Sequence, residues 1–168
     1  MHAWLHSNLN PAEPIINYRL PKNLVPYHYD LTIQPFFNAT QKPEFYEAKE
    51  KIQFRCVNDT KKFVIHIKNL EITNNSLRIS SISDDSFQSI ENFEWTYDNV
   101  TSFFTADLGQ NQTFLANQNY MFEAEFKGFT NNDDLGFYRT SYKDDSNNTR
   151  FLECFVLKQI SEFFYINV

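Results

Sequence analysis

Glycine is scarce in this chain, with only 3 residues among 168. Phosphate-binding loops and G-x-S-x-G nucleophile elbows need closely spaced glycines, because only glycine lets the backbone turn that tightly or approach a ligand that closely. Both kinds of site are therefore excluded. The chain has 19 asparagines, the residue that best replaces glycine where φ is positive. We therefore expect turns built from Asn and Asp.

Cysteine is also scarce. Cys56 and Cys154 are the only two, so a framework of several disulfides is excluded and at most one bridge is possible. A bridge needs Cα atoms within about 7 Å of each other, which the sequence does not determine. Two interpretations stay open: one bridge, or two separate thiols that are buried or otherwise partnered.

Long hydrophobic runs and an excess of positive charge are both missing. The apolar segment 151–168 still contains Glu153, Lys158 and Glu162, whereas a bilayer span needs about 20 mostly uncharged residues. The formal net charge is −6, whereas nucleic-acid binding needs a basic surface. We therefore predict no membrane span and no nucleic-acid partner. Phe, Leu, Ile and Val supply 48 of the 168 residues, enough for a packed core in one domain.

Apolar and polar residues alternate over much of the chain, which is the period of half-buried strands. Polar turns separate five such segments: 29–33, 52–56, 63–67, 93–97 and 120–126. This pattern predicts an all-β fold, a saddle-like antiparallel β-sandwich. Residues 1–17 contain Pro11 and Pro14 and are expected to form an arm before a β-domain at 18–150. Residues 151–168 form a hydrophobic tail with weak helical spacing.

The four histidines do not form a catalytic pattern. His2 and His6 have the i, i+4 spacing of zinc ligands, but the H-E-x-x-H motif needs Glu directly after the first His, and here that residue is Ala3. His28 and His66 lie at or within predicted strands and are interpreted as structural. The acidic pairs 84–85, 133–134 and 144–145 lie in turn-rich segments, where Asp caps and solvates the backbone. We therefore predict no catalytic, metal-binding or substrate-binding residue in this chain.

Six asparagines have the N-x-[Ser/Thr] context of N-glycosylation, against roughly 2.5 that the composition gives by chance. They are Asn38, Asn58, Asn74, Asn99, Asn111 and Asn147. The excess favours an extracellular or cell-surface glycoprotein, although an Asn-rich composition by itself also inflates the count. Residues 1–10 show no charged region followed by an apolar run, so no signal peptide supports this localisation.

Three segments carry a family resemblance when they are taken in order. Residues 18–31 read YRLPKNLVPYHYDL, similar to an opening Y-R-L-P-x-x-x-x-P-x-H-Y-x-L. Residues 52–72 place Cys56, Thr60, Ile65-His66 and Leu70 in a strand, turn and strand. The third segment runs from Tyr120 through Tyr142, with Gly128 and then GFYRTSY at 136–142. It is similar to the signature GFYRS-Y that follows a Y-x-L-x-I-x-F-x-G strand. Together these segments resemble the N-terminal β-domain of the aminopeptidase N family of gluzincin zinc metallopeptidases.

The resemblance implies a fold and a context. Family members remove single N-terminal residues from peptides, with zinc held by the histidines of an H-E-x-x-H helix and a downstream Glu, and with a G-x-M-E-N loop near the substrate amine. These motifs belong to the catalytic domain after the β-domain, and none occurs in this sequence. The family's own Gln or Glu in the β-domain has no clean match in residues 150–159. We therefore expect a chain that is inactive alone and holds no cofactor. Its expected partner is the missing catalytic domain, and it would meet peptide substrate only there.

The sequence departs from the family pattern after about Leu152. This departure predicts a truncated or misspliced product whose last residues are foreign to the family. The alternative is a genuinely short relative that uses the tail as a helix. A different class also stays open: a stand-alone extracellular β-sandwich that binds a protein or a glycan through its aromatic and acidic surface.

Overall fold

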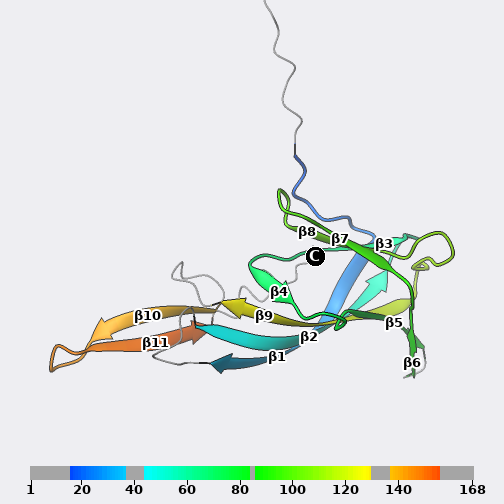
Figure 1. Cartoon of the computed structure of the whole chain (residues 1–168). Coiled ribbons are helices and arrows are strands. Elements are labelled where there is room, and N and C mark those ends of the chain that lie inside the picture. Colours follow the sequence, from blue (N-terminus) through cyan, green and yellow to red (C-terminus); the bar gives the residue numbers. More distant parts are fainter. Residues whose placement is uncertain (1–15, 37–43, 84–85, 130–136, 156–168) are drawn as a thin grey trace, which may run out of the picture.

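The structure is a computed structural model that describes residues 16–36, 44–83, 86–129 and 137–155 (Figure 1). Eleven β-strands and no helix occur in these ranges. Every pair of neighbouring strands is antiparallel. The predicted all-β, saddle-like antiparallel sandwich is therefore confirmed.

The large sheet has six strands in the order β1-β2-β9-β5-β6, and β4 also pairs with β9. β2 and β9 form its centre through an eleven-residue register that runs from Phe45 opposite Phe129 to Arg55 opposite Asn119. The strands are β1 (Leu24–Phe36), β2 (Phe45–Cys56), β4 (Leu70–Ile72), β5 (Arg78–Ser83), β6 (Ser86–Ser89) and β9 (Asn119–Phe129).

A small sheet covers one end of the large one (Figure 1). Its order is β3-β8-β7, with strands β3 (Lys62–His66), β8 (Phe103–Asp107) and β7 (Glu94–Asp98). A separate hairpin, β10 (Phe137–Lys143) and β11 (Thr149–Phe155), projects from the opposite end of the large sheet (Figure 1). β7 is an edge strand, and all five of its residues are exposed.

Phenylalanine rings join the two sheets. Phe63 of β3 packs on Phe54 of β2 and on Phe122 of β9, with ring centroids 4.9 and 4.7 Å apart. Phe104 of β8 approaches Phe122 at 6.0 Å. All four side chains are fully buried. Such aromatic contacts stabilise beyond the area they bury, so this cluster fixes how the sheets sit on each other.

Asparagine builds the turns, as the shortage of glycine predicted. In the described ranges, six residues other than glycine have positive φ, and five of these are asparagines. The asparagines are Asn69, Asn75, Asn92, Asn117 and Asn147, and the sixth residue is Ser102. Asparagine tolerates this left-handed region because its short side chain can bond to the local backbone.

The helical spacing noted over 151–168 is wrong at 151–155. Those residues belong to β11, which pairs with β10 from Phe137 opposite Phe155 to Lys143 opposite Thr149. The seven cross-strand residue pairs stabilise a strand here. The helical spacing of the apolar residues was weak, because Phe151 already interrupts it. Residues 156–168 lie outside the described part of the chain, as does most of the expected arm.

Candidate functional site

Of the two histidines that the structure describes, His66 has structural contacts. His28 is exposed on β1, where the register with β2 shifts. Nε2 of His66 lies 3.2 Å from the carbonyl oxygen of Tyr18, and its ring packs edge-on against Phe103 with centroids 4.9 Å apart. His66 therefore ties the entry segment to the small sheet. His2 and His6 lie outside the described residues.

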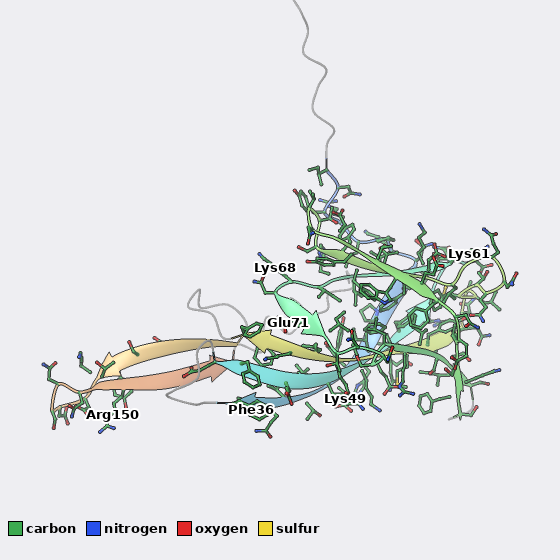
Figure 2. The ribbon with its side chains drawn as sticks, viewed as in Figure 1. Phe36, Lys49, Lys61, Lys68, Glu71 and Arg150 are labelled. Carbon is green, nitrogen blue, oxygen red and sulfur yellow. The ribbon has the colours of Figure 1, made fainter. Side chains whose placement is uncertain are left out.

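Asp144, in the one acidic pair that is described, organises the β10–β11 turn. Its Oδ1 accepts hydrogen bonds from the backbone N–H groups of Ser146 and Asn148, at 3.0 and 2.9 Å. Its Oδ2 lies 2.9 Å from Nε of Arg150, which Figure 2 places on this hairpin. These hydrogen bonds hold the pKa of Asp144 below its ordinary value. The carboxylate is committed to the turn, as the sequence predicted.

The described residues offer no site for zinc. No group of three or more His, Cys, Asp or Glu side chains among them is arranged to hold a metal ion. Zinc needs at least three protein ligands even in an open catalytic site. A search of the same residues also finds no helix long and apolar enough to cross a membrane.

A groove opens where the small sheet leaves the inner face of the large sheet uncovered. It has a volume of about 660 Å³, within the usual range of ligand pockets of about 300–1,000 Å³. We call it the aromatic groove. Its lining comprises Ile67, Asn69, Leu70, Ile72, Thr73, Asn74, Asn75, Leu77, Phe93, Trp95, Tyr97 and Phe104.

Two exposed aromatic side chains of β7 form one wall of the groove. Trp95 is 53% exposed and Tyr97 is 42% exposed, although both lie on the inward face of the small sheet. Trp95 stacks on Phe104 at 5.6 Å with an interplanar angle of 25°. The hydroxyl of Tyr97 donates to the carbonyl oxygen of Ile67 at 2.9 Å. Both rings are therefore held in place without a ligand.

The lining of the aromatic groove carries no charged side chain. Its polar side-chain groups are the amides of Asn69, Asn74 and Asn75, the hydroxyls of Thr73 and Tyr97, and the indole N–H of Trp95. By contrast, a neighbouring hollow beyond Asn74 is lined by Lys49, Arg78, Glu123 and Glu125 among others. The groove thus suits a neutral ligand with an apolar face and hydrogen-bonding edges.

Glu50 is an acid inside the core. It is fully buried on β2, at a position whose inward neighbours on the strand are Ala48 and Ile52 and whose cross-strand partners are Leu31 and Ala124. Neither carboxylate oxygen has a hydrogen-bond partner among the described residues. Burial raises the pKa of Glu50 to about 8, because the charged form loses its hydration.

Among the described residues, no basic side chain bonds to the Glu50 carboxylate on its own face of the sheet. The basic residues Lys49 and Lys51 alternate to the other face, where they pair with Glu125 and Glu123 at 3.2 and 3.0 Å. Figure 2 shows Lys49 on the side of the sheet away from the small sheet. Sequence reasoning missed Glu50, although the alternation of residues 52–56, extended back along β2, places it inward.

Cys56 is a free, fully buried thiol at the end of β2. Its Sγ lies 3.0 Å from the carbonyl oxygen of Asn58 and 3.4 Å from that of Phe114. Burial raises the pKa of this thiol, and the charge of Asp59 adds to the effect. Cys56 is therefore a packed structural residue, since reactive cysteines have a lowered pKa and some exposure. Cys154 lies in β11, and its side chain is outside the described part.

Five of the six glycosylation sequons fall in the described ranges, and the asparagine of each is exposed. They lie in turns or loops, and none lies within a strand: Asn58, Asn74, Asn99, Asn111 and Asn147. Asn38 lies outside the described residues. Of the five described sequon asparagines, Asn74 alone lines the aromatic groove.

The described part is thus a two-layer antiparallel β-domain. Residues 25–156 match the model of the Peptidase M1 N-terminal domain. The chain belongs to this family, and the resemblance to the N-terminal domain of aminopeptidase N-like peptidases is confirmed. The matched range ends at residue 156, so it includes all of β11.

Several named aminopeptidases are similar to this chain. Aminopeptidase N of Rattus norvegicus is 27% identical over 149 residues, which cover 84% of this chain and 15% of the rat protein. Aminopeptidase 2 of Candida albicans is 33% identical over 147 residues, with 86% and 14% covered. The mitochondrial Aminopeptidase 2 of Saccharomyces cerevisiae is 28% identical over 125 residues, with 74% and 12% covered. The chain therefore spans about one seventh of the length of the curated relatives that it matches.

Proposed function

We propose that this chain is the non-catalytic β-domain of a zinc-dependent aminopeptidase, which in its complete form removes N-terminal residues from peptides. The observation that carries the proposal is the family match over residues 25–156. The names of the similar proteins, all aminopeptidases, agree with it. The family match also favours this interpretation over a stand-alone adhesion module.

In the complete protein the domain acts as a scaffold. The zinc-binding motif would lie in the catalytic domain, as the family resemblance implies, since the described residues of this chain contain no metal-binding group. The aromatic ring cluster between the two sheets gives the domain a fixed shape. A rigid neighbour can support a catalytic domain and help to close its substrate cleft. Peptide substrate would meet the domain only in that assembly.

We place the protein outside the cell or at its surface, as a glycoprotein. Five exposed sequons in turns or loops support this placement, because glycans need surface positions that tolerate bulk. Because all five asparagines are exposed, a glycan can be attached to each one. The name of one yeast relative includes the word mitochondrial, which differs from the placement proposed for this chain.

The test of the proposed activity compares two lengths of the protein. Sequencing the transcript and the genomic DNA downstream of codon 168 is expected to reveal H-E-x-x-H in frame, followed by a Glu. The longer product, supplied with zinc, is expected to release leucine from a chromogenic amide, and the chain of 168 residues is expected to release none. Turnover by the short chain itself, or a longer product without the motif, would contradict the proposal.

A further inference from the structure

We infer that the aromatic groove holds the first sugars of an N-linked glycan attached to Asn74, and that this glycan covers Trp95. The inference rests on the proposed glycoprotein. In this inference the glycan on Asn74 has a structural role, because its sugars cover the exposed aromatic rings of β7. The ligand of the groove is thus a covalent part of the same protein.

The attachment point lies on the groove. Asn74 is exposed and contributes to the groove lining together with its neighbours Thr73 and Asn75. A glycan on its side chain therefore starts at the lip and needs no long path to reach Trp95. Asn58, Asn99, Asn111 and Asn147 do not belong to the lining.

The turn that carries Asn74 is fixed to the large sheet. The N–H of Thr73 donates to the carbonyl oxygen of Glu125 at 2.8 Å. The hydroxyl of Ser76 lies 2.8 Å from the carbonyl oxygen of Thr73, and it accepts from the N–H of Glu125 at 3.1 Å. Asn75 has φ of 60°, which completes the reversal of the chain. These bonds give Asn74 a defined position beside the groove.

The chemistry of the wall fits a sugar. A pyranose ring has a face of C–H groups that packs on aromatic rings, and hydroxyls at its edge that need hydrogen-bond partners. Trp95 and Tyr97 provide ring faces two residues apart on one side of β7, and the amides of Asn69 and Asn75 provide the partners. A neutral sugar also matches a lining without charge. The rings are already held by Phe104 and Ile67, so little side-chain entropy is lost when the sugar binds.

Asn74 also borders two other hollows, so the direction of the glycan is the point to be tested. One of them is lined by Lys49, Arg78, Glu123 and Glu125, which are charged and hydrated. The other includes Glu47, Lys49 and Lys127. Only the aromatic groove places two exposed aromatic rings in reach. We therefore expect the sugar to lie against Trp95 and not across the charged face.

Trp95 itself reports the result. The chain has two tryptophans, so Trp4→Phe leaves Trp95 as the only one. The full chain with this substitution is secreted from a eukaryotic host behind an added signal sequence, next to the same chain with Asn74→Gln. Asn111→Gln is the matched control, because Asn111 is an exposed sequon asparagine outside the groove lining. Mass spectrometry of glycopeptides gives the occupancy, and acrylamide quenching of fluorescence gives the access to Trp95.

Glycosylated protein is expected to show quenching of Trp95 at least about twofold weaker than the Asn74→Gln variant, because the exposed half of the ring is then covered. Asn111→Gln is expected to leave quenching unchanged. Enzymatic removal of the glycans from the folded protein gives a second measurement without any variant, and quenching is expected to rise to the level of Asn74→Gln. Equal quenching with and without the glycan on Asn74 would overturn the inference.

The occupancies separate this inference from the proposed function. Glycans on Asn111 and Asn99 with none on Asn74 would overturn the inference while leaving the glycoprotein intact. The absence of glycans from all six sequons would refute the inference and the proposed glycoprotein, and it would leave the proposed aminopeptidase activity untouched. Occupied Asn74 with a protected Trp95 would support the inference.

Discussion

Replacing Glu50 by Gln is expected to stabilise the protein at neutral and alkaline pH. Glu50 is fully buried without hydrogen-bond partners among the described residues, and burial raises its pKa from 4.5 to about 8. The folded protein therefore prefers the protonated acid. Stability from this preference is complete below about pH 4.5 and is lost as the pH rises towards about 8. Gln resembles the protonated acid in shape and stays neutral at every pH.

The magnitude follows from the two pKa values. One pKa unit corresponds to about 1.4 kcal/mol. The difference between 4.5 and about 8 thus amounts to roughly 5 kcal/mol above pH 8, and to roughly 3 kcal/mol at pH 7. Domains of this size are stable by about 5–15 kcal/mol in total, so the effect is a large share of the whole.

Urea unfolding of both proteins at several pH values between 5 and 9 measures this difference. The gap in unfolding free energy between Glu50→Gln and the unchanged chain is expected to be small at pH 5 and to widen steadily up to about pH 8. Glu47→Gln is the control, because Glu47 is exposed on the opposite face of the same strand. A gap that stays constant from pH 5 to 9 would refute the reasoning, since a well-solvated Glu50 with the same pKa in the folded and unfolded states gives that result.

Three further outcomes are expected from packing, burial and exposure. Gly128→Ala is expected to destabilise the domain by about 1–3 kcal/mol in urea unfolding, because a Cβ would overlap the ring of buried Tyr46. An unchanged urea midpoint would show that the ring moves aside freely. Cys56, in a variant without the other cysteine, is expected to react with a thiol reagent only as fast as the protein unfolds, because burial raises its pKa and blocks access; rapid labelling of the folded chain would contradict this. The pair of Lys49 and Glu125, each about half exposed, is expected to contribute less than about 1 kcal/mol in a double-mutant cycle, and a larger, salt-insensitive coupling would mean that the pair is shielded from water.

Local patterns were sufficient where one face of a strand is buried. The alternation in residues 52–56, 63–67 and 120–126 predicted parts of β2, β3 and β9, because burial on one side enforces a period of two. The short strands were not predicted. β4 has three residues and β6 has four exposed ones, so neither shows a recognisable alternation. They are strands because β9 and β5 offer them backbone partners.

The site could be predicted only in part. The sequons are visible as triplets, and the structural roles of His66 and Asp144 followed from their neighbours in the sequence. The sequence placed Trp95 and Tyr97 in a strand, but it did not predict that their side chains are exposed. Alternation places them on the inward face, and only the small sheet's position over the large one leaves that face open at β7.

The sequence by itself determined the class of fold, the Asn-built turns and the family, because these depend on residue types and on their spacing along the chain. Tertiary structure alone decided which asparagine lies beside the aromatic groove and that Glu50 lacks a partner, because both depend on strand register and on the packing of one sheet over another. The segment 73–75 and the pair Trp95 and Tyr97 are apart in sequence, and they meet at one groove because β4 and β7 belong to different sheets.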